Sequence, residues 1–209
     1  MGDLEHLFFQ EKFIKKILEE YRPRTKEFQK GEIILKKDTA ENRLCLLLKG
    51  TAYLYIENEY DTRQLLDFFM RGQLMCHEML PTPNDGYCYI QAKHPCTVVY
   101  LDWPEPAGCT PGKQDRCLAA FLPLTFRSII AARNEHCHML QQKTIRSKLL
   151  AFLHYQRIRQ GSRTIRIPIP YSDLAEYLTI DRTSLMTELS KMDAEGLIHK
   201  KAYVIRLEN

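Results

Sequence analysis

Several polar side chains near the C-terminus could bind nucleic acid, and they share one side of a predicted helix: Arg182, Thr183, Ser184, Thr187 and Lys191. The apolar residues Leu185, Leu189 and Met192 recur at steps of four and three, the period of a helix with one buried face. Arginine can bond guanine in bidentate fashion, and hydroxyls can bond bases or phosphates. The pattern predicts a helix that enters the major groove of DNA. A compact helical hairpin with a solvated polar face is the simpler alternative.

The preceding residues predict the first helix of a helix-turn-helix motif. Ser172 stands where a helix N-cap is expected, and Ala175 is small where a second helix must cross closely. Asp181 offers an N-cap for the second helix, and Gly196 can end it in a left-handed conformation. The N-terminus of the second helix can also attract phosphate, and Ser172 is a further candidate DNA-binding residue.

A short hairpin is predicted to follow as a wing. Residues 197–207 alternate between apolar and polar types, and His199, Lys200 and Lys201 lie near the expected turn. Residues 142–209 carry 12 Lys and Arg against 7 Asp and Glu, whereas residues 1–141 carry 18 against 19. The positive charge is therefore concentrated where DNA is expected to bind, with Lys200 and Lys201 as candidate phosphate contacts.

Enzyme and membrane classes have no support in the sequence. It contains no glycine-rich phosphate loop, nucleophile elbow or His/Glu metal motif, so we predict no catalytic residue and no metal site. The seven cysteines form no Cys-x-x-Cys pair, and no apolar run is long enough to span a membrane. We expect a cytoplasmic protein with reduced cysteines.

The N-terminal half predicts an antiparallel β-barrel or sandwich. A helical pattern from Leu4 to about Tyr21 is followed by evenly spaced apolar runs at 32–35, 44–48, 52–56, 65–69, 87–92 and 96–101. Gly31, Gly50, Gly72 and Gly86 mark the turns. The predicted fold class is α+β, with an N-terminal antiparallel barrel and a C-terminal winged helix-turn-helix.

A long helix is predicted between these parts. The residues at its alternating three- and four-residue steps would form a dimer seam, which we assign to Leu122, Phe126, Ile129, Arg133, His136 and Leu140. Packing of this face onto the chain's own barrel is the alternative. The expected domains are a sensor barrel with its N-terminal helix at 1–112, a dimerisation helix at 113–142 and a DNA-binding domain at 143–209.

The whole chain resembles the CRP/FNR family of bacterial transcription regulators. The resemblance is carried by "DLAEYL" at 173–178, "DRTSLMTELSKMDAEGLI" at 181–198, "LLDFFMRGQLMCHEML" at 65–80 and "IQAKHPCTVVYLD" at 90–102. It implies a homodimer that senses an effector or redox signal in a cyclic-nucleotide-binding-like barrel and binds a pseudo-palindromic promoter site on double-stranded DNA. RNA polymerase is then a candidate partner.

The recognition helix departs from the pattern of the best-known members. Those members begin this helix with Arg-Glu and carry a second arginine five residues after the first. Here Arg182 matches, but Thr183 and Thr187 replace the other two, so we expect an uncommon operator. Thr179 also occupies a turn position where glycine is usual.

The segment that resembles the family's effector site departs further. Glu78 is retained, but His77 replaces a glycine, and Gly86 or Tyr87 stands where an arginine would hold the cyclic phosphate. The sequence therefore argues against a cyclic nucleotide, and the cofactor is left unassigned. The candidate pocket residues are Cys76, His77, Glu78, Tyr87 and Tyr89.

Two alternatives stay open for function. A haem-based gas sensor would use Cys76 and His77, although their spacing differs from that of the haem-binding branch, and a thiol-based redox sensor would use Cys76, Cys88 or Cys96. A barrel cysteine beside a turn histidine is the simpler explanation of Cys76 and His77. A winged-helix module for protein–protein contact, with the barrel as a scaffold, is the second alternative.

Overall fold

In the computed structural model, the protein divides into two compact units, one within Phe9–Thr125 and one within Phe126–Asn209. The structure describes residues 15, 19, 24–36, 43–60, 62–76, 80, 86–102 and 113–208; for 43, 101, 102, 113–122, 124, 125 and 128 it describes only the backbone. Most of the helix expected at 4–21 lies outside these residues. Lys15 and Glu19 are helical and form an ion pair of 3.9 Å.

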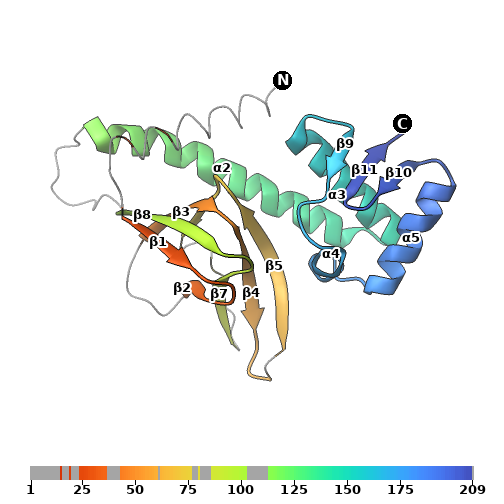
Figure 1. Cartoon of the computed structure of the whole chain (residues 1–209), viewed down its shortest axis with the longest axis horizontal. Coiled ribbons are helices and arrows are strands. Elements are labelled where there is room, and N and C mark those ends of the chain that lie inside the picture. Colours follow the sequence, from red (N-terminus) through yellow and green to blue (C-terminus); the bar gives the residue numbers. More distant parts are fainter. Residues whose placement is uncertain are drawn as a thin grey trace. The chain divides into compact units, whose positions relative to one another are not determined.

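The first unit contains two four-stranded antiparallel sheets (Figure 1). One has the strand order β1 (Thr25–Phe28), β8 (Cys96–Asp102), β3 (Arg43–Lys49) and β6 (Leu74–Cys76). The other has the order β2 (Ile33–Lys36), β7 (Tyr87–Ala92), β4 (Thr51–Glu57) and β5 (Arg63–Met70). The evenly spaced strands expected from the sequence are confirmed.

The strands form two sheets and not the closed barrel that was expected. In the described part of the chain, no ladder of hydrogen bonds joins an edge strand of one sheet to an edge strand of the other. Successive strands such as β1 and β2 belong to different sheets, so the chain crosses repeatedly between them. The two layers enclose apolar residues, among them Leu46, Leu54 and Ile90, each at most 1% exposed.

Two of the predicted turn glycines are required by close backbone approach. Gly50 has a φ of 92°, and a Cβ there would lie 2.3 Å from the carbonyl oxygen of Pro95. Gly86 has a φ of 122°, and a Cβ there would lie 2.1 Å from the carbonyl oxygen of Glu57. Neither position has room for a side chain, so glycine is needed at both.

The second unit begins within the long helix α2 (Lys113–Gln141), which is followed by α3 (Ile145–Gln160). A capping box starts α3, because Thr144 Oγ1 accepts from the Ser147 amide while Ser147 Oγ accepts from the Thr144 amide. Gly161 ends the helix with a φ of 59°. No helix in the described part of the chain is both long and apolar enough to cross a membrane.

The remaining elements form the predicted winged helix-turn-helix. Helices α4 (Tyr171–Tyr177) and α5 (Arg182–Ala194) precede the hairpin of β10 (Ile198–Lys201) and β11 (Val204–Leu207). Strand β9 (Thr164–Arg166) pairs with β11, which gives a three-stranded antiparallel sheet. The core of this unit includes Phe152, Leu174 and Leu185, each at most 1% exposed.

Candidate nucleic-acid interface

Helix α4 begins two residues earlier than expected, at Tyr171. Its N-cap is Pro170, which makes no side-chain capping bond, so the prediction of Ser172 as N-cap is wrong. Proline has a fixed φ that suits the start of a helix, and the helix begins directly after it. Ser172 lies instead within the first turn of α4, where it is exposed and donates to Asp173 Oδ1 at 3.0 Å.

The turn between α4 and α5 has left-handed geometry at Thr179, whose φ is 52°, although threonine replaces the glycine usual at this position. Its hydroxyl donates to the carbonyl oxygen of Leu178 at 2.7 Å. Lys148 Nζ donates to the same carbonyl oxygen at 2.9 Å and to Thr179 Oγ1 at 3.2 Å. Lys148, on α3, therefore satisfies the carbonyl end of α4 and holds the turn.

The predicted signals at both ends of α5 are confirmed. Asp181 Oδ1 accepts from the Ser184 amide at 2.9 Å, and this bond lowers the pKa of Asp181. At the other end, Gly196 has a φ of 72°, and the amide of Leu197 donates to the carbonyl oxygen of Met192. This pair of features is the Schellman motif, which satisfies the last carbonyls of a helix.

The buried and exposed faces of α5 also match the prediction. Leu185, Leu189 and Met192 are fully buried. Four side chains of the opposite face are exposed, namely Arg182, Thr183, Thr187 and Lys191, and Ser184 is half-buried. The structure thus presents a guanidinium, two hydroxyls and an ammonium along one exposed surface of the second helix of the motif.

The wing is held against α4 by two tyrosines that the sequence did not single out. The rings of Tyr171 and Tyr203 stack, with centroids 5.1 Å apart and 14° between their planes. Tyr171 donates from its hydroxyl to the carbonyl oxygen of Ala202 at 2.7 Å, and burial raises the pKa of Tyr171 to about 12. Of the predicted wing cations, Lys201 is exposed, and half-buried Lys200 has its Nζ 5.9 Å from the Tyr171 ring centre.

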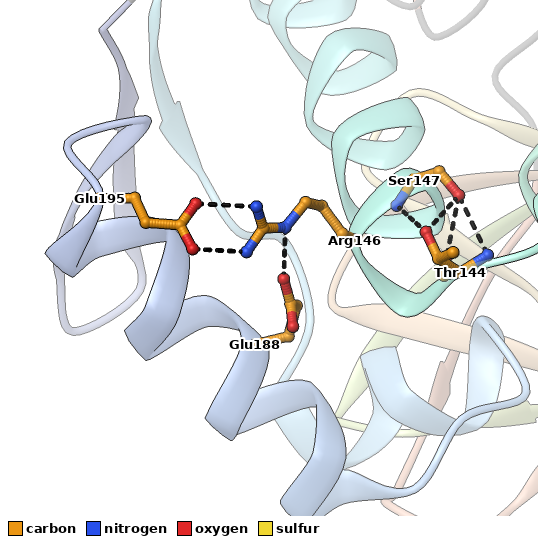
Figure 2. Close-up of polar contacts among 5 residues, drawn as sticks. All are labelled: Thr144, Arg146, Ser147, Glu188 and Glu195. Carbon is orange, nitrogen blue, oxygen red and sulfur yellow. Dashed lines mark hydrogen bonds and ion pairs between the residues drawn. The ribbon is translucent and has the colours of Figure 1, made fainter.

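An arginine on α3 binds α5 at two places (Figure 2). Arg146 Nε donates to Glu188 Oε1 at 2.5 Å, and its two terminal nitrogens donate to the carboxylate of Glu195 at 2.7 and 2.8 Å. The bonds raise the pKa of Arg146 and lower that of Glu195. The seven-residue spacing of Glu188 and Glu195 was a signal for one shared helix face, but the sequence did not identify their partner.

The predicted dimer seam is described from Phe126 onward, because the side chain of Leu122 lies outside the described residues. Phe126, Ile129, Arg133, His136 and Leu140 are half-buried, and the neighbouring Ile130 is 59% exposed. His136 packs within its own chain, where its Nε2 donates to the carbonyl oxygen of Tyr177 at 2.8 Å. The seam itself stays a prediction.

Those candidate effector residues that the structure describes lie on both sheets of the first unit. Cys76 ends β6 and is 1% exposed, whereas His77 and Glu78 lie outside the described residues. Tyr87 and Tyr89 lie on β7 with their rings stacked at 5.7 Å. Tyr89 donates to Glu57 Oε2 at 2.7 Å, and burial together with this bond raises the pKa of Tyr89 to about 12.

A metal site is not apparent in the described part of the chain. No three or more His, Cys, Asp or Glu side chains are grouped there so that they could hold a metal ion. The cysteines at 45, 76, 88 and 96 are buried, and burial raises the pKa of Cys96.

Two protein-family models match the sequence. Residues 25–105 match the cyclic nucleotide-binding domain, and residues 147–209 match the Crp-like helix-turn-helix domain. The two matches fall on the two sheets and on the winged helix-turn-helix, and together they cover more than half of the chain. No curated protein matches the sequence.

Solved structures share the fold at low sequence identity. A cyclic nucleotide-binding domain containing protein from Listeria monocytogenes is similar, with a TM-score of 0.67 and 14% identity over 99% of this chain and 98% of that one. FixK2 from Bradyrhizobium japonicum is similar with a TM-score of 0.64 and 16% identity, over 90% of this chain and 93% of that one. The c-di-GMP-responsive global regulator CLP from Xanthomonas campestris is similar with a TM-score of 0.62 and 14% identity, over 94% of this chain and 98% of that one.

Proposed function

Because the chain belongs to the CRP/FNR family of DNA-binding transcription regulators, we propose that it is a homodimeric regulator whose α5 reads an operator in the major groove. The observation that carries this proposal is the two-sided character of α5. Its buried stripe fixes it in the core, while Arg182, Thr183, Thr187 and Lys191 remain exposed to meet DNA. Lys200 and Lys201 on the wing would contact the neighbouring phosphates.

We propose that the operator differs from the one common in the family. Arg182 lies in the first turn of α5, where a bidentate pair with guanine is geometrically favoured. Thr183 and Thr187 can donate or accept one hydrogen bond each and present a methyl group, which suits contact with a thymine. A pair of such helices in a symmetric dimer would read a pseudo-palindromic site.

The dimer would form through the α2 seam, in keeping with the expected domains at 1–112, 113–142 and 143–209. Contact with RNA polymerase and a cytoplasmic location accompany this role and belong to the same proposal. The alternative role of the winged helix, contact with another protein, does not explain why cations are exposed on α5 and the wing.

We infer that the effector is not a cyclic nucleotide. An arginine at position 86 would have its Cβ 2.1 Å from a backbone oxygen of β4, so the phosphate-binding side chain cannot be placed there. Position 87 holds a tyrosine stacked on Tyr89. The fold itself does not select a ligand, since the similar regulator from Xanthomonas campestris responds to c-di-GMP.

Thiol sensing has less support than an unidentified small-molecule effector. Reactive cysteines need exposure and a lowered pKa, whereas Cys76 and Cys96 are buried and the pKa of Cys96 is raised. Haem ligation by Cys76 and His77 is tested by the absorption spectrum of protein purified from a haem-supplied host.

Selection of bound sequences from random double-stranded DNA tests the proposed function. We expect a two-fold-symmetric consensus with a guanine in each half-site, and an affinity that falls steeply with salt as counterions are released. Repeating the selection with candidate effectors and oxidants would identify the signal. Recovery of no consensus, with or without them, would contradict the proposal.

A further inference from the structure

Arg146 uses all three of its guanidinium nitrogens to hold the recognition helix α5 against α3 (Figure 2). The pair with Glu195 is bidentate, with two parallel N–H···O bonds, and the bond from Nε to Glu188 is a third. Bidentate arginine–carboxylate pairs impose a geometry as well as a charge. These bonds use three of the five N–H groups of the guanidinium, and each of its nitrogens donates to a carboxylate.

The two attachment points constrain the placement of α5. Glu188 and Glu195 are seven residues apart, which is close to two turns and about 10 Å along the helix axis. Over seven residues the face of a helix drifts by only ~20°, so both carboxylates lie on the same flank. Two fixed points on one flank oppose both sliding of α5 along its axis and rotation about it.

Arg146 is itself well placed, because it lies between the two residues of the capping box that starts α3. Thr144 and Ser147 satisfy each other's amides at the helix start. The same helix buries Leu149 and Phe152 in the core of the unit. The clamp therefore connects α5 to a helix whose own start is fixed, and we define it as Arg146, Glu188 and Glu195.

We propose that Arg146 is a positioning residue for operator recognition, which acts through Glu188 and Glu195 by fixing the register of α5 in the major groove. This inference rests on the proposed function. Base-edge contacts such as that of Arg182 tolerate little displacement, whereas phosphate contacts by mobile lysines tolerate more. Loss of the clamp should therefore reduce discrimination between operator and unrelated DNA more than it reduces general DNA affinity.

The test measures the affinity of the full-length protein for its selected operator and for unrelated DNA of equal length. We expect Arg146→Gln to lower the ratio of the two affinities by roughly tenfold, with less than about threefold change on unrelated DNA and an unchanged salt slope. Arg163→Gln, which removes the same charge from an exposed position of the same unit, should leave the ratio unchanged. A fall of equal size on both DNAs, with a smaller salt slope, would show a direct phosphate contact and overturn the proposal.

Combined variants test whether Arg146 acts through the two carboxylates. Glu188→Ala/Glu195→Ala should reproduce the loss of the ratio, and adding Arg146→Gln should cause little further loss; additive losses would contradict the proposal. Arg146→Lys should not restore the ratio, because an ammonium cannot form the bidentate pair. Full restoration of the affinity ratio would mean that a positive charge at position 146 is enough, which would contradict positioning by a bidentate pair.

Stability and the proposed function are controlled separately. Circular dichroism checks that each variant is folded. If Arg146→Gln unfolds, Glu195→Gln at the helix end gives the same comparison while the bond to Glu188 stays intact. The ratio of operator affinity to unrelated-DNA affinity should still fall in that variant. If the unmodified protein selects no operator, the proposed function fails. If it selects one and all clamp variants keep its affinity ratio, only the role of Arg146 fails.

Discussion

The imidazole of His136 lies flat on the phenol ring of Tyr177, with 3.7 Å between the ring centroids and 5° between the planes. Its Nε2 donates to the backbone carbonyl oxygen of Tyr177, so the end of α2 is bound to the end of α4 by the same residue pair. Because a carbonyl only accepts, the proton must be on Nε2 of the neutral ring. A long helix is thereby attached to the first helix of the DNA-binding motif.

This contact predicts a pH dependence of stability. Burial lowers the pKa of His136, so the unfolded chain binds the proton more readily than the folded protein. The contribution of His136 is fully present above the unfolded pKa of about 6.5 and is lost as the pH falls through the lower folded pKa. Urea unfolding at pH 7 and pH 5 should show a smaller loss of stability in His136→Gln than in the unmodified protein. Equal losses would contradict the assignment.

The recognition residues predict two different effects on DNA binding. Arg182→Ala should weaken operator binding by about 1–3 kcal/mol and relax the preference for guanine, because the proposed bidentate base contact is lost. Lys201→Ala should weaken binding to all sequences alike and reduce the salt slope by about 0.9. Fluorescence anisotropy titrations at several salt concentrations measure both. If the two variants behaved alike, groove docking by α5 would be in doubt.

We expect the hydroxyl of Tyr171, which contacts the wing, to stabilise the folded protein. Tyr171→Phe removes the bond to the Ala202 carbonyl but keeps the stacked ring, so the free energy of unfolding should fall by about 0.5–1.5 kcal/mol. Tyr203→Phe is the matched control, because the described residues provide no hydrogen bond to its hydroxyl. Urea titration followed by circular dichroism measures the difference. An equal effect of the two variants would argue against the bond.

The strained backbone of the turn between α4 and α5 leads us to expect a stabilising substitution at Thr179. Thr179 has a φ of 52°, a conformation that costs a β-branched residue of order 1–3 kcal/mol. Thr179→Gly should remove this strain and raise the free energy of unfolding by about 1 kcal/mol after the entropic cost of glycine. Thr187→Gly, within the exposed face of α5, should instead lower it. A loss at both positions would show that the hydroxyl contacts of Thr179 outweigh the strain.

The seam predicts a change of oligomeric state. Phe126→Ala/Ile129→Ala removes two half-buried apolar side chains from the predicted dimer face of α2, and the mass in solution should fall to that of a monomer. Ile158→Ala, at a position 56% exposed on α3, serves as the control and should leave the mass unchanged. Light scattering measures the mass. An unchanged dimer in the seam variant would place the interface elsewhere.

Features that depend on neighbours in the chain could be read from the sequence. The cap at Asp181 and the left-handed ending at Gly196 were predicted because their hydrogen bonds join residues three to five apart. The buried stripe of α5 was predicted from its period. The start of α4 was misplaced because a serine and a proline both suit a helix start, and only the backbone geometry distinguishes them.

The contacts that position the motif could not be read in this way. His136 and Tyr177 are 41 residues apart, Tyr171 and Ala202 are 31 apart, and Arg146 lies 42 and 49 residues from its two carboxylates. No local rule selects such partners, because many cations and aromatic rings of the chain are equally suitable by type. The sequence by itself determined the candidate reading residues and the shape of the motif. Packing of α3, α4 and the wing decided which side chains hold α5, since only folding brings distant groups within hydrogen-bond reach.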